Sequence, residues 1–362
     1  MKRGAVPCAL VVAGGTGGHI FPGLALALAL QKRGWRVHWL GATGSAAAPS
    51  MESRLVPAHG VALTTIDFAG VRGKGWRTWL GLPLRLVRAC WQSFRLFWRV
   101  RPDVVLGLGG YVSLPAGLTA VCLRVPLLLH EQNAAAGLAN RVLARLARRV
   151  FTAFPSVMAD AQWVGNPLRE AFLQQPEPAV RFANRHGPLR VLVVGGSLGA
   201  QVLNQVVPRA LAQLPKAQRP QVRHQSGAAH IEALRATYAA LDVSAELTPF
   251  IEDTASAFAD ADLVVCRAGA STVAELAAVG AAALLVPLPT AVDDHQTHNA
   301  QFLASQGAAW LVAQAQLSPA WLAQRLQTFT REGLLDCAQR AKRLQKTDAT
   351  EQIVAACEDL CK

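Results

Sequence analysis

Four glycines and a histidine follow an apolar segment near the start of the chain. Residues 10–22 read LVVAGGTGGHIFP, with Thr16 and His19 among the glycines. Glycine lets the backbone turn sharply and approach a ligand closely, and the N–H groups at the start of a following helix can bind an anion. The pattern predicts a buried parallel strand that ends in a phosphate-type loop. Pro22 is expected in the first turn of the helix that follows.

A second glycine-rich turn occurs half a chain length later. Residues 189–200 read LRVLVVGGSLGA, and the segment GGSLG at 195–199 falls opposite GGTGG at 14–18. A single glycine-rich turn after a strand is a weak signal, because ordinary strand-to-helix corners use one too. Two such turns, each after an apolar strand, favour twin α/β domains.

Other polar residues follow predicted strands of the first half. Gly109, Gly110 and Tyr111 come after a strand at 103–108, and the run HEQN at 130–133 comes after a strand at 125–129. Because the carboxyl ends of parallel strands open on the ligand crevice, these residues are expected to share one rim with His19. A core histidine or a loop hydrogen bond remains the alternative for each of them. The uncharged stretch 104–123 contains glycines and a proline, so it predicts strand, loop and helix instead of a membrane span.

The second half carries further candidates. The run 268–275 reads AGASTVAE and begins a helix whose first N–H groups could hold a phosphate. Thr272 and Glu275 also fit a capping box, which on spacing alone is the favoured interpretation. The run VDDHQTHNA at 292–300 is the last segment that resembles a site. These motifs contain no DxD-like acidic pair, and the cysteines show no zinc-type spacing, so no obligatory metal is expected; Asp293 and Asp294 are the nearest candidates.

Charge is distributed unevenly. The chain has a formal net charge of +13, with 52% hydrophobic and 16% charged residues, which indicates a packed protein. Residues 1–165 contain 19 Lys and Arg against 5 Asp and Glu, whereas residues 166–362 contain 17 against 18. The first half is therefore expected to meet an anionic partner, which could be nucleic acid, a membrane or a phosphorylated substrate.

The most basic segment, residues 70–101, has eight Lys and Arg, six aromatic residues and no acid. Pro83 is expected to open a helix that ends before Pro102. One stripe of this helix is apolar at three-four spacing and is expected to be buried core, with arginines on the neighbouring sector. The stripe consists of Leu84, Val87, Trp91, Phe94 and Trp98.

Apolar residues beside arginine before and at the start of this helix suggest contact with an anionic membrane surface. The candidate membrane patch is Trp76, Arg77, Trp79, Leu80, Arg85 and Arg88. Nucleic acid is disfavoured, because no recognition motif accompanies the charge.

Seven ordered motifs resemble the MurG family across nearly the whole chain. They are GGTGGHIFP, GLGGYVS, HEQNAAAGLANR, VGNPLR, VVGGSLGAQVLN, CRAGASTVAE and DDHQTHNA. The resemblance implies an α/β fold of the GT-B type, with two Rossmann-like domains whose parallel sheets face a cleft. It implies an acceptor- and membrane-binding domain at 1–163, a UDP-sugar-binding domain at 164–340 and a C-terminal helix at 341–362.

The resemblance also implies an activity. The family transfers N-acetylglucosamine from UDP-N-acetylglucosamine to the undecaprenyl-pyrophosphate-linked muramyl pentapeptide of peptidoglycan synthesis. It implies a peripheral enzyme at the cytoplasmic face of the cell membrane. Two rivals are a soluble GT-B enzyme such as a UDP-N-acetylglucosamine epimerase, which has no use for the basic aromatic segment, and a non-catalytic UDP-sugar-binding subunit, which would not need His19.

Site roles carry over position by position as implications of the resemblance. Thr16, Gly17 and Gly18 correspond to donor and acceptor contacts, Asn133 and Gln296 to sugar contacts, Arg169 and Ser197 to pyrophosphate contacts, and Ile251 to a main-chain contact with uracil. Ala270, Ser271, Thr272, Val273 and Ala274 correspond to the helix start that takes phosphate, with Glu275 on the ribose hydroxyls. Two adjacent hydroxyls suit a two-oxygen acceptor, which makes this role of Glu275 the better interpretation than the cap. Gly109, Gly110, Tyr111 and His19 are the acceptor-side candidates.

Inversion at the sugar carbon requires a base for the attacking hydroxyl and donors for the departing pyrophosphate. His19 is the candidate base. It is expected at a helix N-terminus, where the positive end of the dipole disfavours an imidazolium and leaves a neutral nitrogen as acceptor. A structural or acceptor-phosphate role is the alternative.

Overall fold

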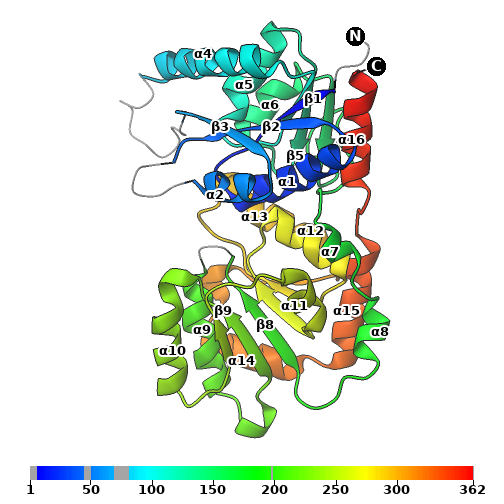
Figure 1. Cartoon of the computed structure of the whole chain (residues 1–362). Coiled ribbons are helices and arrows are strands. Elements are labelled where there is room, and N and C mark those ends of the chain that lie inside the picture. Colours follow the sequence, from blue (N-terminus) through cyan, green and yellow to red (C-terminus); the bar gives the residue numbers. More distant parts are fainter. Residues whose placement is uncertain (1–5, 45–49, 69–80, 197–198, 362) are drawn as a thin grey trace. The chain divides into compact units, whose positions relative to one another are not determined.

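The chain folds into two α/β units, each built on a parallel sheet (Figure 1). The computed structural model describes residues 6–44, 50–68, 81–196 and 199–361. The candidates Trp76, Arg77, Trp79, Leu80 and Ser197 lie outside these ranges. The first unit comprises residues 1–169 together with 347–362, and the second comprises 170–346. The boundaries expected at 163/164 and 340/341 therefore lie inside the units, because the first unit runs on to Arg169 and the last helix returns to it.

The first unit has a sheet of order β3-β2-β1-β4-β5-β6-β7, parallel throughout. Its strands are β1 (Cys8–Val12), β2 (Arg36–Ala42), β3 (Ala62–Ile66), β4 (Val104–Gly107), β5 (Leu127–Glu131), β6 (Arg149–Thr152) and β7 (Gln162–Trp163). Its helices are α1 (Gly17–Lys32), α2 (Met51–Ala58), α4 (Leu82–Val100), α5 (Ser113–Cys122), α6 (Leu138–Ala144) and α16 (Ala349–Leu360). The central strands β1 and β4 are buried along their whole length, as their uninterrupted apolar sequences predict.

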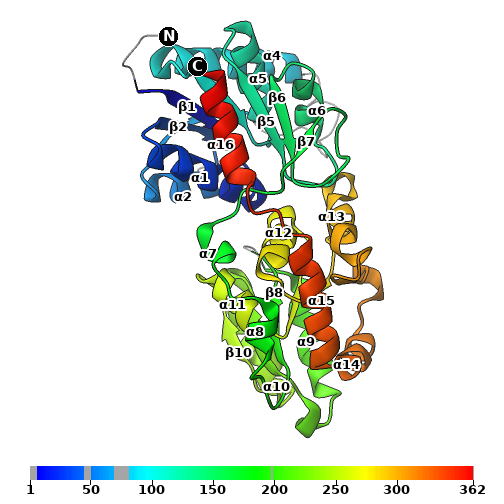
Figure 2. The same cartoon turned by 90° about the vertical axis from the view of Figure 1, so that its right-hand side faces the viewer.

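Helices cover both faces of this sheet. α1 and α16 pack on one face, where Ile20, Leu26 and Ile353 join a core with β1 and β4, and α4 and α5 pack on the other face (Figure 2). α1 begins at Gly17, so Pro22 lies inside the helix and the expectation that it occupies the first turn was wrong. Because proline has no backbone N–H, α1 lacks the hydrogen bond from residue 22 to the carbonyl oxygen of Gly18.

α4 spans the range that Pro83 and Pro102 predict, but the face that it buries was predicted wrongly. The buried residues are Ala89, Ser93, Leu96 and Phe97. The expected core stripe is exposed instead, with exposed fractions of 77% at Leu84, 66% at Val87, 60% at Trp91, 37% at Phe94 and 71% at Trp98. The helix carries a second apolar stripe, and this second one packs against α5.

The second unit has a sheet of order β10-β9-β8-β11-β12-β13, also parallel. Its strands are β8 (Arg190–Val194), β9 (Gln221–Gln225), β10 (Glu246–Thr248), β11 (Leu263–Cys266), β12 (Ala283–Leu285) and β13 (Trp310–Leu311). Its helices are α7 (Glu170–Leu173), α8 (Pro178–Phe182), α9 (Gln201–Ala212), α10 (Ile231–Ala240), α11 (Thr254–Asp260), α12 (Ala270–Val279), α13 (His295–Ala304), α14 (Pro319–Thr328) and α15 (Arg331–Arg343). The two doubly wound Rossmann-like sheets confirm the predicted fold class.

In the part of the chain that the structure describes, no helix is both long and apolar enough to span a bilayer. The stretch 104–123 forms β4, a loop and α5, as predicted.

Candidate active site

The two glycine loops of the first unit touch at the point where the strand order reverses. β1 and β4 are neighbours in the sheet although β2 and β3 intervene in the chain, and ligands bind outside the carboxyl ends of strands at such a point. A Cβ on Gly110 would lie 2.4 Å from the carbonyl oxygen of Gly14, and Gly110 has φ +80°. Only glycine permits this approach of the two backbones.

His19 lies in the first turn of α1, beside this contact. Thr16 is the N-cap residue of α1, and its side chain makes no capping hydrogen bond. The imidazole of His19 packs on the backbone of Gly109, where a Cβ would lie 2.9 Å from its Cε1 atom. Its Nδ1 atom is 2.8 Å from Oε1 of Gln132. The predicted base therefore lies on the rim where the β1, β4 and β5 ends meet.

Buried Glu131, the last residue of β5, holds the loop that carries Asn133. Its Oε1 atom accepts a hydrogen bond from the backbone N–H of Asn133 at 2.9 Å, and its Oε2 atom accepts from the N–H of Gly137 at 3.1 Å and from Nδ2 of Asn140 at 2.8 Å. A buried carboxylate with this many donors is satisfied and holds its neighbours firmly. Glu131 therefore fixes the backbone position of Asn133, the predicted sugar contact.

Two further candidates of the first unit lie near its glycine loops. Tyr111 directly follows Gly110 and is 50% exposed. The guanidinium of Arg169 lies over the ring of Phe21, 5.3 Å from its centroid. The same ring lies 3.2 Å from where a Cβ of Gly17 would be. Arg169 is therefore next to the start of α1, where a cation and helix N–H groups together suit an anionic group.

The second unit has its own switch point between β8 and β11. Here Gln225, the buried last residue of β9, joins two loop segments. Its Oε1 atom accepts from the N–H of Gly195 at 3.1 Å, and its Nε2 atom donates to the carbonyl oxygens of Gly196 and Pro249, both at 3.1 Å. A Cβ on Gly199 would lie 1.9 Å from the carbonyl oxygen of Ser226, so the loop and the end of β9 touch through glycine.

α12 begins directly after β11, in the position expected for a phosphate site. Its N-cap is Gly269 and its first residue is Ala270, so Thr272 and Glu275 lie within the helix and the capping box was wrong. Glycine offers no side chain to the first N–H groups. The hydroxyl of Ser271 is buried and, within the described residues, has no hydrogen-bond partner. N–H groups without a capping side chain, together with a hydroxyl donor, suit a bound phosphate.

The remaining donor candidates lie on the same carboxyl edge of the second sheet. Ile251 follows β10 and is buried, two residues beyond the Pro249 carbonyl that Gln225 holds. Gln296 lies in the first turn of α13, and its Oε1 atom accepts from the N–H of Leu288 at 2.9 Å. This bond leaves the amide nitrogen as the end that a sugar hydroxyl would meet.

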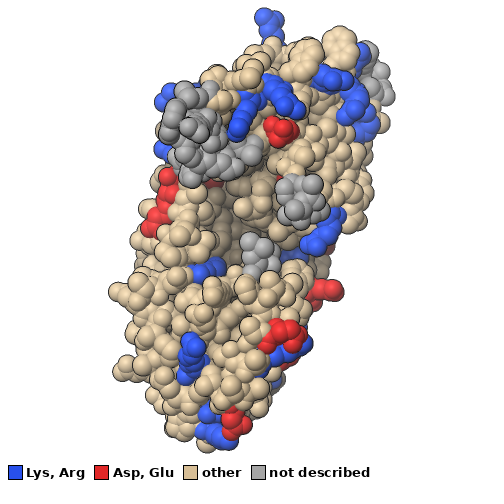
Figure 3. All heavy atoms as spheres, turned by 90° about the vertical axis from the view of Figure 1, so that its left-hand side faces the viewer, with Lys and Arg blue, Asp and Glu red and all other residues tan. Residues whose placement is uncertain are grey.

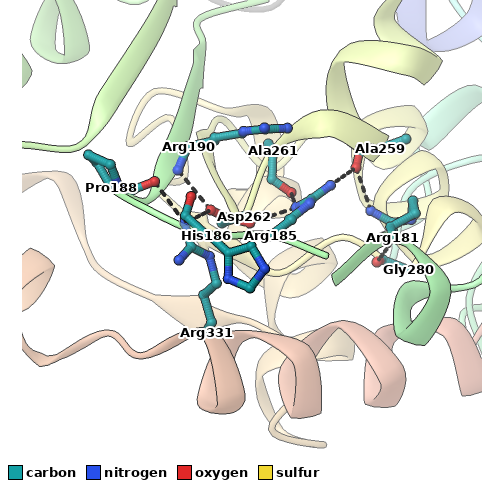
Figure 4. Close-up of polar contacts among 10 residues, drawn as sticks. All are labelled: Arg181, Arg185, His186, Pro188, Arg190, Ala259, Ala261, Asp262, Gly280 and Arg331. Carbon is teal, nitrogen blue, oxygen red and sulfur yellow. Dashed lines mark hydrogen bonds and ion pairs between the residues drawn. The ribbon is translucent and has the colours of Figure 1, made fainter. Parts of the chain in front are cut away.

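A cluster of charged residues at the opposite, amino edge of this sheet is structural (Figure 4). Asp262 is fully buried just before β11, and its carboxylate accepts from Arg185 at 2.6 Å and from the N–H of Arg190 at 2.8 Å. Arg331 reaches the same carboxylate at 3.5 Å. Arg181 donates to the carbonyl oxygens of Ala259 and Gly280. The cluster joins α8, α11 and α15 to the sheet.

Within the described ranges, no group of three or more His, Cys, Asp or Glu could hold a metal ion. Asp293 and Asp294, the acidic pair that the sequence offers, both have positive φ, and Asp294 accepts a hydrogen bond from Thr297 at 2.7 Å.

Two residues of the site received no role from the sequence, Gln132 and Gln225. Both are buried glutamines at the carboxyl end of a strand and directly beside a glycine loop. The signal available was a glutamine within or just after a predicted strand, in HEQN and in HQSG. A buried amide at that position needs partners, and the nearest loops supply them.

Comparison with known proteins gives a consistent result. The N-terminal domain of glycosyltransferase family 28 matches residues 9–152, and the C-terminal domain of the same family matches residues 190–353. A protein of Albidiferax ferrireducens is 67% identical over 352 residues, which cover 97% of this chain and 91% of that protein. A protein of a Polaromonas species is 65% identical over 354 residues, which cover 98% of this chain and 92% of that protein. Both relatives are named UDP-N-acetylglucosamine–N-acetylmuramyl-(pentapeptide) pyrophosphoryl-undecaprenol N-acetylglucosamine transferase. The crystal structure of Acinetobacter baumannii MurG superposes with a TM-score of 0.84 at 39% identity, covering 98% of this chain and 99% of that one.

Proposed function

The chain belongs to the MurG family of glycosyltransferases, and from this we propose the reaction that it catalyses and the residues that serve it. It transfers N-acetylglucosamine from UDP-N-acetylglucosamine to the 4-hydroxyl of undecaprenyl-pyrophosphoryl-N-acetylmuramyl-pentapeptide, with inversion at the sugar carbon. The observation that carries this proposal is the identity of 65–67% over nearly the whole length with transferases of that name. An epimerase or a non-catalytic subunit has no comparable support.

The second unit binds the donor. Its carboxyl edge offers the helix start at Ala270, the hydroxyl of Ser271 and the glycine loop for the pyrophosphate, and the backbone at Ile251 for uracil. Glu275 takes the ribose hydroxyls, since a carboxylate can accept from two adjacent hydroxyls. Gln296 offers its amide nitrogen to the sugar. N–H groups and a hydroxyl stabilise the charge that develops on the departing pyrophosphate.

The first unit binds the acceptor and supplies the base. Nε2 of His19 removes the proton from the attacking hydroxyl, and the N–H groups at the start of α1 suit the acceptor pyrophosphate. The imidazole is held against Gly109 and Gln132, so the base is fixed before the substrates arrive. We propose that this transfer requires no bound metal, and full turnover in excess chelator is the check.

We propose that the exposed stripe of α4 places the enzyme on the membrane that holds its lipid-linked acceptor. Leu84, Val87, Trp91, Phe94 and Trp98 are exposed along one side of the helix, and Arg85 and Arg88 flank them. The upper part of Figure 3 shows Lys and Arg side chains set among uncharged side chains. Apolar residues that enter the interface, beside cations that face anionic headgroups, bind a peripheral protein.

The deciding experiment is turnover of UDP-N-acetylglucosamine with the lipid-linked muramyl pentapeptide, measured for the wild-type protein and for His19→Ala and Glu275→Ala. Wild-type turnover is expected. His19→Ala should lower kcat by roughly 100-fold or more with the donor KM unchanged. Glu275→Ala should weaken UDP binding measured by calorimetry. Absence of wild-type turnover would overturn the proposed reaction, and full activity of His19→Ala would remove its role as base.

A further inference from the structure

A chain of hydrogen bonds runs from the candidate base into the interior of the first unit. Nδ1 of His19 lies 2.8 Å from Oε1 of Gln132. Nε2 of Gln132 lies 3.0 Å from Nδ1 of His130, and Nε2 of His130 lies 2.8 Å from the carbonyl oxygen of Gly165. Gln132 and His130 are both buried, with exposed fractions of 0% and 2%.

The amide of Gln132 has only one orientation that satisfies its neighbours. Its Nε2 atom lies 3.0 Å from the backbone carbonyl oxygen of His130 as well as from the His130 ring. A carbonyl oxygen can only accept, so the NH₂ end of the amide must face it. The carbonyl end of Gln132 then faces His19, and since that oxygen also only accepts, Nδ1 of His19 must carry a hydrogen.

The inner end of the chain is fixed in the same way. The carbonyl oxygen of Gly165 requires a hydrogen on Nε2 of His130, so Nδ1 of His130 is the acceptor for the second hydrogen of the Gln132 amide. Burial lowers the pKa of His130 to about 4, so this ring is neutral at neutral pH and keeps its acceptor nitrogen. The carbonyl oxygens of His130 and Gly165 can only accept, so they fix the direction of every hydrogen bond between Gly165 and His19.

We propose that Gln132 and His130 are positioning residues that hold neutral His19 in the tautomer with its lone pair on Nε2. The proposal rests on the function proposed above, in which Nε2 of His19 accepts the proton of the acceptor hydroxyl. Gly109 holds the other side of the same ring. The atom of His19 that does not face Gln132 is then the acceptor that a general base needs.

The device differs from a carboxylate–histidine pair in its charge. An amide fixes the tautomer and the ring orientation, but it brings no negative charge and cannot take a proton at neutral pH. The proton that Nε2 accepts therefore leaves from Nε2 and does not pass inward to His130.

The tautomer is measured directly by ¹⁵N NMR of histidine-labelled protein at about pH 8, where an ordinary imidazole is neutral. His19→Asn identifies the His19 signals by their loss. The wild-type spectrum should show a protonated Nδ1 and an unprotonated Nε2 for His19. The opposite assignment in the wild-type protein would overturn the proposal, and this result needs no variant of Gln132 to fold.

Gln132→Met keeps the volume of the side chain and removes both of its hydrogen-bonding ends. We expect mixed tautomers of His19 in its spectrum. We also expect kcat to fall roughly 10- to 100-fold, a part of what a general base contributes, with the donor KM unchanged. Thr119→Val is the matched control, because it removes a buried side-chain hydrogen bond to Pro115 elsewhere in the same unit and should leave kcat unchanged.

A double-mutant cycle separates positioning from general damage. If Gln132 acts through His19, then Gln132→Met should cost nothing further in the His19→Ala background. Losses that multiply in the double variant would overturn the proposal. If His19→Ala keeps full activity, the proposed base fails, whereas the wild-type NMR spectrum still decides whether Gln132 fixes the ring.

Discussion

At the scale of single residues, Gln225 connects two parts of the donor site. One amide holds Gly195 and Gly196 of the glycine loop and the carbonyl of Pro249, beside the segment proposed to contact uracil. Since the side chain is buried, no water can replace these bonds without a rearrangement. The loop for the pyrophosphate and the loop for the base are therefore set relative to each other by one side chain.

Gln225→Leu should weaken binding of UDP by about tenfold or more. Without the amide, the glycine loop at Gly195 and Gly196 has to be ordered when UDP binds, and this ordering costs binding free energy. Isothermal titration calorimetry of the purified variant measures this. Gln221→Leu is the control, since Gln221 is exposed at the other end of the same strand. Equal UDP affinity for wild type and Gln225→Leu would show that the loop holds its conformation without the amide.

At the scale of elements, α4 has two apolar stripes, and the sequence alone does not show which of them is buried. Both stripes have helical periodicity, and the aromatic one is the more apolar of the two. The helix buries the stripe of smaller residues, such as Ala89 and Ser93, which lets it approach α5 closely. The aromatic stripe lies on the surface with the arginines. The rings of Trp91 and Phe94 stack there, with their centroids 5.9 Å apart.

Replacing Trp91 and Trp98 by Ser should reduce the fraction of protein that sediments with anionic vesicles by several-fold. The thermal midpoint should not fall, because both side chains are exposed in the folded protein. Val180→Ser, at an exposed position of the second unit, is the matched surface control. Unchanged sedimentation of the double tryptophan variant would place the membrane-binding surface elsewhere.

The buried carboxylate of Asp262 supports the second unit at the edge away from the donor site. Asp262→Ala leaves Arg185, which is only 7% exposed in its side chain, as a buried charge without its carboxylate. A loss of roughly 3–5 kcal/mol in the free energy of unfolding of this unit is expected. Lys216→Ala, which breaks an exposed pair with Asp242, should cost far less. Denaturant titration followed by circular dichroism compares the two, and equal losses would contradict the assignment.

At the scale of the whole molecule, the sequence predicted the fold class and the edges where ligands bind, because buried parallel strands and glycine turns leave local patterns. His19, Asn133 and Ala270 lie on the predicted rims for that reason. The role of Gln132 was not predictable, because a tautomer depends on partners that lie 113 residues apart in sequence. The second unit ends at 346 and not at the expected 340 for a related reason, since the sequence of a helix does not show against which unit it packs.

The chain passes from the first unit to the second and back, and α16 is the part that returns. Ile353 and Val354 are fully buried in the core that α16 shares with α1. Arg33 pairs with Glu351 and Glu358, and Arg149 with Asp359. Each buried aliphatic side chain contributes roughly 2 kcal/mol, so most of the stabilisation by this helix comes from packing and little from its exposed ion pairs.

A chain that ends at Lys346 should therefore lose the first unit and keep the second. The fragment 170–346 is expected to fold and bind UDP in calorimetry, because its core contains no residue of α16. The fragment 1–169 should show exposed apolar surface by dye binding, and joining residues 347–362 to its end through a flexible linker should restore cooperative unfolding. Cooperative unfolding of 1–169 alone would show that the first unit does not depend on α16, and failure of 170–346 to bind UDP would show that the donor site needs residues of the first unit.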